Sequence, residues 1–137
     1  MVHTPLLMAS AGAALALAGC APAKAGGALD DATQCRIMVD LAGQLKADNY
    51  NPRVGRIDCR AAFAAAGLPM HGLRGKGDRT GPRHIVEFEP AQTVGGGTVA
   101  LRLAYQCLYL CGHGEEVTAK RRSGRWTITA RKTTWVS

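Results

Sequence analysis

The five cysteines are the residues of this chain with the most distinctive chemistry, and two of them lie near a histidine. Cys107, Cys111 and His113 are separated by three residues and by one residue. Two thiolates and an imidazole can bind zinc or copper, but structural zinc usually needs Cys-x-x-Cys spacing and a second ligand pair, which this sequence lacks. We therefore expect no metal site and no cofactor, and we keep a minor metal carrier using these three residues as an alternative.

Other catalytic patterns are weak in this sequence. It contains no Gly-x-Ser-x-Gly, His-Glu-x-x-His or phosphate-binding glycine motif. Glu87 and Glu89 would share one face of a strand, but solvated side chains have the same spacing. A nucleophile pair of Cys111 and His113 would require a base within hydrogen-bond reach, which spacing alone does not establish. We therefore expect that the protein is not an enzyme.

The first cysteine follows directly on an apolar segment and a glycine. Residues 6–18, LLMASAGAALALA, are too few to span a bilayer but are typical of the apolar core of a signal peptide. The preceding MVHTP lacks the usual Lys or Arg. Leu17-Ala18-Gly19-Cys20 resembles the lipobox of bacterial lipoproteins. The resemblance implies cleavage after residue 19, a diacylglycerol on Cys20 and a further acyl chain, such as palmitate, on the new N-terminus.

This resemblance also implies a location. The lipid would hold the protein in the membrane of the bacterial cell envelope, because two or three acyl chains anchor far more firmly than one. Ala21, where an aspartate favours the inner membrane of enteric bacteria, implies the outer membrane, facing the periplasm. The alternative is an ordinary secretory signal cut near Ala23, with Cys20 lost.

Four cysteines remain in the mature chain, and they suggest two disulfides. An even number in an exported domain is typical of cross-linked folds. Three pairings of Cys35, Cys59, Cys107 and Cys111 are possible. We favour Cys35 with Cys59 and Cys107 with Cys111, and the second pair needs a bend, because residues four apart in a straight strand lie about 13 Å apart. Alternatively, Cys107 or Cys111 reaches a helix cysteine.

The first half of the mature chain has helical patterns. Residues 20–29 form a small-residue tether that carries the lipid, and 30–137 form one domain. Asp30 or Asp31 is expected to cap a helix over 32–47, and Asp58 a short helix over 59–66 that ends at Gly67. The buried face of the first helix is expected to hold Cys35, Met38, Val39, Ala42 and Leu45.

The second half has the alternation of strands. Strands are expected over 84–89, 98–111, 115–122 and 125–130, with 133–137 extending the last one and turns at 94–98 and 112–114. The pattern Tyr-x-Cys-x-x-Leu-Cys-Gly-x-Gly over 105–114, followed by Ser-Gly-Arg-Trp, resembles the C-terminal part of small secreted bacterial proteins. That resemblance implies only an export-compatible fold. The predicted class is α+β, with two N-terminal helices packed on an antiparallel sheet of about four strands.

Charge indicates the kind of partner. The net charge is +7, which favours anionic partners, although scattered cations are also typical of a solvated surface. The candidate binding residues are the cations of the glycine-rich loop 70–83: Arg74, Lys76, Arg79 and Arg83. We expect an anionic envelope component or a periplasmic protein as the partner, and no nucleic acid. The predicted function is a lipid-anchored envelope protein with a binding or structural role; the alternative is an inhibitor or accessory subunit of a periplasmic enzyme.

Overall fold

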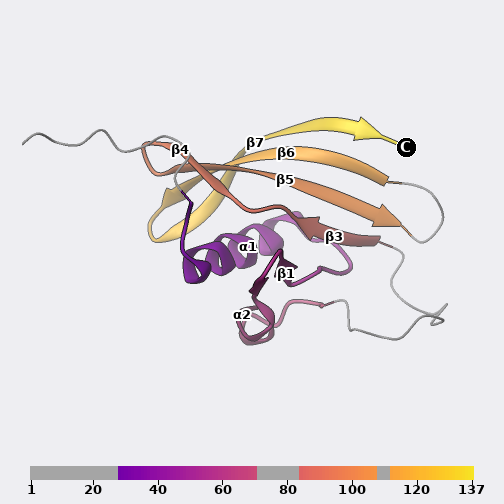
Figure 1. The fold of residues 1–137 in the computed structure, drawn as a ribbon, viewed down its shortest axis with the longest axis horizontal. Helices are drawn as coiled ribbons and strands as arrows, with labels where there is room; N and C mark the ends of the chain where they lie inside the picture. The colour runs from indigo at the N-terminus through magenta and orange to yellow at the C-terminus, as the bar shows by residue number, and fades with distance from the viewer. Residues whose placement is uncertain (1–27, 71–83, 108–111) are drawn as a thin grey trace, which may run out of the picture.

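The computed structural model describes residues 28–70, 84–107 and 112–137. Helices α1 (Asp31–Leu45) and α2 (Arg60–Ala65) lie on one side of a twisted sheet, and none of the described residues forms a helix on the opposite face (Figure 1). No helix in these three segments is long and apolar enough to cross a membrane. The strands are β1 (Arg53–Val54), β2 (Ile57–Asp58), β3 (His84–Phe88), β4 (Gln92–Gly95), β5 (Thr98–Cys107), β6 (Gly112–Arg122) and β7 (Arg125–Val136).

The main sheet is antiparallel and has five strands in the order β3-β5-β6-β7, with β4 also paired to β5. The α+β class is confirmed, but the sheet has one strand more than expected, because residues 92–95 pair with β5 instead of forming only a turn. β1 and β2 form a separate two-stranded sheet. β5 contacts three other strands, so it is the centre on which the sheet is built.

Helix α1 begins at Asp30, as the sequence predicts. The Asp30 carboxylate accepts a hydrogen bond from the Thr33 backbone N–H at 2.8 Å, the usual N-cap arrangement. The helix ends at Lys46, which adopts the left-handed conformation with φ 51°. The predicted buried face was only partly right: the buried residues are Gln34, Ile37, Met38, Leu41 and Ala42.

The short helix α2 is tied to α1 by a disulfide between Cys35 and Cys59, which confirms the first predicted pair. Cys59, and not Asp58, is the N-cap residue, and Cys59 makes no side-chain cap bond. Asp58 instead accepts a hydrogen bond from the Arg60 backbone N–H at 3.1 Å. Gly67, with φ 66°, follows the helix where the sequence predicts its end.

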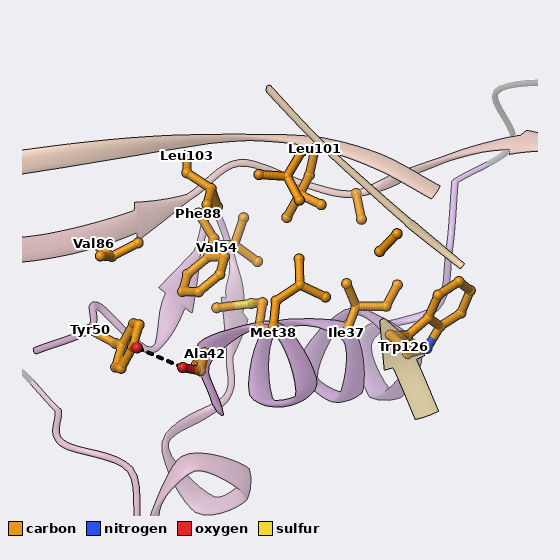
Figure 2. Packing of buried hydrophobic residues seen from close by; sticks show 14 of the residues in the cluster. Ile37, Met38, Ala42, Tyr50, Val54, Val86, Phe88, Leu101, Leu103 and Trp126 are labelled. Atoms are coloured by element: carbon orange, nitrogen blue, oxygen red, sulfur yellow. Dashed lines mark hydrogen bonds between the residues drawn. The ribbon is translucent and has the colours of Figure 1, made fainter. Parts of the chain in front are cut away.

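The core lies between α1 and the sheet (Figure 2). Val99, Leu101 and Leu103 of β5 point toward the helix, as their alternation predicts. Tyr50 is 1% exposed, and its hydroxyl donates a hydrogen bond to the Ala42 carbonyl at 2.6 Å. The hydroxyl also accepts a bond from the Ala47 N–H at 2.8 Å. This buried phenol therefore closes the C-terminal end of α1 against the sheet.

The predicted turn at Gly112-His113-Gly114 is wrong, because these residues form the start of β6. Gly112 and Gly114 allow the Trp135 indole of β7 to lie directly on the strand: a Cβ added at Gly114 would be 2.6 Å from Trp135 Cδ1. The glycines therefore serve close packing here, and the hairpin turn after β6 is the predicted Ser123-Gly124, whose φ angles are 49° and 76°.

Side chains of α1 cover part of the edge of β7. Asp40 accepts a hydrogen bond from the Trp126 backbone N–H at 2.9 Å. The Gln44 amide donates to the Trp126 carbonyl at 2.7 Å and accepts from the Ile128 N–H at 2.9 Å. These bonds replace a neighbouring strand, and they fix the base of the β6–β7 hairpin to the helix layer.

Candidate functional site

Most residues singled out from the sequence lie outside the described residues. These are Cys20, the loop cations Arg74, Lys76, Arg79 and Arg83, and Cys111. Cys107 ends β5, but its side chain is not among those described. The second disulfide and the metal alternative therefore stay predictions. Among the described side chains no three His, Cys, Asp or Glu residues form a group that could hold a metal ion.

The structure brings together one cluster of titratable side chains that spacing did not predict. Tyr105 of β5 lies opposite His113 of β6, and their rings stack with centroids 4.3 Å apart. His113 Nε2 lies 3.3 Å from Glu115 Oε1. The Arg131 guanidinium of β7 donates to both Glu115 oxygens, at 2.8 and 3.0 Å, and to the Tyr105 hydroxyl at 3.0 Å.

A β-bulge places Arg131 in this cluster. Ala119 pairs with Ile128 and Thr118 with Ala130, so Thr129 is an extra residue in β7. The extra residue reverses the alternation, and Arg131 comes to lie opposite the buried Val117. Without the bulge, Ala130 would occupy this face and Arg131 would point away from Glu115.

Charge pairing and burial determine the electrostatics of this cluster. Glu115 is only 8% exposed, and its bidentate pairing with Arg131 provides the charge partner that a buried carboxylate requires. Hydrogen bonding to Glu115 raises the pKa of Arg131 further above its usual value. Burial, together with the negative charge of Glu115, raises the pKa of the Tyr105 hydroxyl to about 12.

The polar groups of this cluster form hydrogen bonds mainly with one another. Both Glu115 oxygens accept from Arg131, and the Tyr105 hydroxyl accepts from the same guanidinium. Such an arrangement holds three strands together at a point where apolar packing ends.

A second polar surface is the β6–β7 hairpin tip, defined by Lys120, Arg121, Arg122 and Arg125. All four side chains belong to exposed residues. This surface was not predicted from the sequence, because the candidate binding residues were taken from the glycine-rich loop. The signal was present as KRRSGR, in which four cations out of six residues flank a Ser-Gly turn.

A groove of about 560 Å³ lies beside this hairpin, between α1, the end of α2 and the start of β7. Its lining includes Asp40, Gln44, Leu68, Arg125 and Trp126. Asp40 and Gln44 already bond the backbone of β7, so the polar floor of the groove serves the fold. Arg125 at its rim joins the groove to the cationic hairpin tip.

Comparison with protein-family models, with curated proteins and with solved structures finds no significant match for this chain. Its function is therefore argued from its own residues alone.

Proposed function

We propose that the protein is a lipid-anchored component of the bacterial cell envelope that acts by binding, without turnover. The observation that carries this proposal is Leu17-Ala18-Gly19-Cys20, placed directly after a short apolar segment and eight residues before Ala28, the first described residue. In this reading Cys20 receives the lipid, and the tether 20–29 joins it to the domain.

The fold gives three further kinds of support. The Cys35–Cys59 disulfide suits an exported protein, because disulfides persist in oxidising compartments and are rare in the cytosol. The described titratable cluster at Glu115 is occupied by its own ion pair, which agrees better with a binding or structural role than with turnover. A cationic hairpin tip offers a surface for an anionic partner in the envelope.

Replacing the lipidated residue tests the anchor. In cells that express the full chain, Cys20→Ser should move the protein from the detergent-extracted membrane fraction to the soluble fraction, or leave it uncleaved. Ala23→Ser, three residues further along, is the matched control and should fractionate as the unaltered protein does. The lipid anchor would be ruled out if Cys20→Ser fractionated as the unaltered protein does and differed from it in mass by no more than the substitution itself.

A protein partner is a second candidate, favoured by the outer edge of β7. β7 is the last strand of the sheet, and α1 side chains bond its edge only at Trp126 and Ile128. Residues 129–136 pair with β6 on one side and with no described strand on the other side. A strand from a partner enzyme could therefore add to this free edge of the sheet.

Photocrosslinking in living cells tests whether a protein partner binds the outer edge of β7. A photoreactive residue at exposed Ala130 should give a discrete protein adduct, and the same residue at exposed Ala64 of α2 should not. Absence of adducts from position 130 would count against an accessory-subunit role.

A further inference from the structure

The hairpin tip is the most strongly charged described surface. Residues 118–127 carry four cations, Lys120, Arg121, Arg122 and Arg125, and no acidic residue. None of the four pairs with another described side chain. Within the described part of the chain, no ion pair therefore neutralises their positive charge.

Three arginines elsewhere in the described chain have an acidic partner. Arg53 and Arg60 both lie within ion-pair distance of Asp58, and Arg131 is paired with Glu115. Other described cations, such as Lys46, Arg56 and Lys132, also pair with no described side chain, but they are far apart in the sequence. The tip differs from them because four such cations lie within six residues.

The fold holds this tip rigidly in place. Its turn is of the kind in which both central residues have positive φ, which matches the twist of the strands. The Arg121 backbone N–H donates to the Gly97 carbonyl at 3.0 Å, which joins the tip to the β4–β5 turn. The bonds from Asp40 and Gln44 hold the first residues of β7. The four cations consequently extend from an ordered support.

Ala28, the first described residue, lies at this same end of the sheet (Figure 1). Ala28 bridges Gln92 of β4, which pairs with Ala100 of β5. Thr98, only two residues from Ala100, lies opposite Lys120 of the hairpin. Since neighbouring strands are about 4.8 Å apart, three strand spacings, or about 14 Å, separate Ala28 from Thr118 of β6, and Lys120 lies two residues further along that strand.

The tether sets a limit on the distance between this end and the lipid. Eight residues separate Cys20 from Ala28, and a fully extended chain spans at most about 3.4 Å per residue, or about 27 Å in total. Lys24 is the only charged residue in this segment, so the tether adds to the positive charge.

From this juxtaposition we propose that the β6–β7 hairpin tip binds the anionic phospholipid surface of the membrane that holds the anchor. The inference rests on the proposed lipid anchor for its geometry. A tether of this length raises the effective concentration of phosphate headgroups at the tip, which favours the membrane over a soluble anionic partner. Asp30 and Asp31 also lie at this end, but they belong to the helix layer, whereas residues 118–127 of the hairpin tip carry only positive charge.

The binding surface would orient the domain. With its tip on the headgroups, the sheet directs its other end, where the Tyr105 cluster and the C-terminus lie, away from the membrane. The lipid would supply permanent attachment, and the tip would restrict the rotation of the domain on its tether.

Vesicle co-sedimentation tests the tip independently of the lipid. The probe is the full chain with Cys20→Ser, mixed with vesicles of phosphatidylcholine alone or with added phosphatidylglycerol. Arg121→Gln/Arg122→Gln/Arg125→Gln should weaken the preference for anionic vesicles about a hundredfold, since each cation near an anionic surface contributes about a fivefold factor. The apolar residues 6–18 are the same in every variant, so a difference in vesicle binding between variants is due to the hairpin cations.

A charge-matched control separates the tip from net charge. Lys46→Gln/Arg56→Gln/Lys132→Gln removes three exposed cations elsewhere and should retain most of the preference. Equal loss in both triple variants, or tighter binding to a soluble polyanion than to the vesicles, would overturn the inference. The anchor is judged separately, by the mass of the unaltered chain, so either proposal can fail while the other stands.

Discussion

Glu115 is the residue on which the far end of the sheet depends. The residue is 8% exposed, and it lies opposite Leu103 on the same face as buried Val117. A carboxylate in such surroundings is tolerated only with a charge partner. Arg131 supplies two of the hydrogen bonds to it.

Removing that partner should be costly. Arg131→Met is expected to lower the free energy of unfolding by about 2–3 kcal/mol, because it leaves the buried carboxylate without its guanidinium. Urea unfolding followed by circular dichroism measures the change. The double variant Glu115→Gln/Arg131→Met should regain part of the loss, and strict additivity of the two single effects would contradict the pairing.

Tyr105 gives this cluster a dependence on alkaline pH. Its pKa is raised from 10.0 to about 12 in the fold, so folding favours the neutral phenol. The resulting stabilisation is fully present below pH 10 and is lost as pH rises toward 12. After allowance for partial exposure it amounts to about 1–2 kcal/mol.

The comparison of Tyr105→Phe with the unaltered protein isolates this effect. The variant should lose less stability than the unaltered protein between pH 10 and 12, and its tyrosinate absorbance should lack one late-titrating group. Parallel stability curves over this range would show that Tyr105 titrates normally.

At the scale of elements, the packing of β7 on β6 depends on glycine. A Cβ at Gly114 would be 2.6 Å from Trp135 Cδ1, so Gly114→Ala should displace the indole. We expect a loss of about 1–3 kcal/mol and stronger quenching of tryptophan fluorescence by iodide. Gly43→Ala on exposed α1 is the control, since nothing lies within 4 Å of its added Cβ, and it should be neutral or stabilising. Unchanged quenching in Gly114→Ala would contradict the packing described.

The predictable part of this fold is the part governed by local pattern. The Asp30 cap, the Ser123-Gly124 turn and the inward row of β5 follow from residue type and alternation. The bulge at Thr129 does not, because it depends on pairing with a distant strand. Arg131 therefore joins Glu115 only in the folded sheet, and Gly112-Gly114 reads as a turn until Trp135 is placed against it.

At the scale of the whole molecule, one covalent link joins α1 to the chain segment that leads into α2. The sequence separation between Cys35 and Cys59 is 24 residues. A disulfide that closes a loop of this size stabilises the folded protein by about 3 kcal/mol, because it restricts the unfolded chain. Cys59→Ala should lower stability by about that amount, measured by thermal unfolding without reductant. Cys35→Ala/Cys59→Ala should cost little more than either single change, whereas additive losses would show that the two thiols act separately.

The lipid at Cys20 is the central claim about this protein, and the intact mass of the chain extracted from membranes tests it most directly. The expected mass is that of residues 20–137 plus a diacylglyceryl group and an acyl group, each in place of one hydrogen of Cys20, less the two hydrogens lost in each disulfide. A mass equal to the uncleaved chain, or to a chain cut near Ala23 and carrying no lipid, would contradict it.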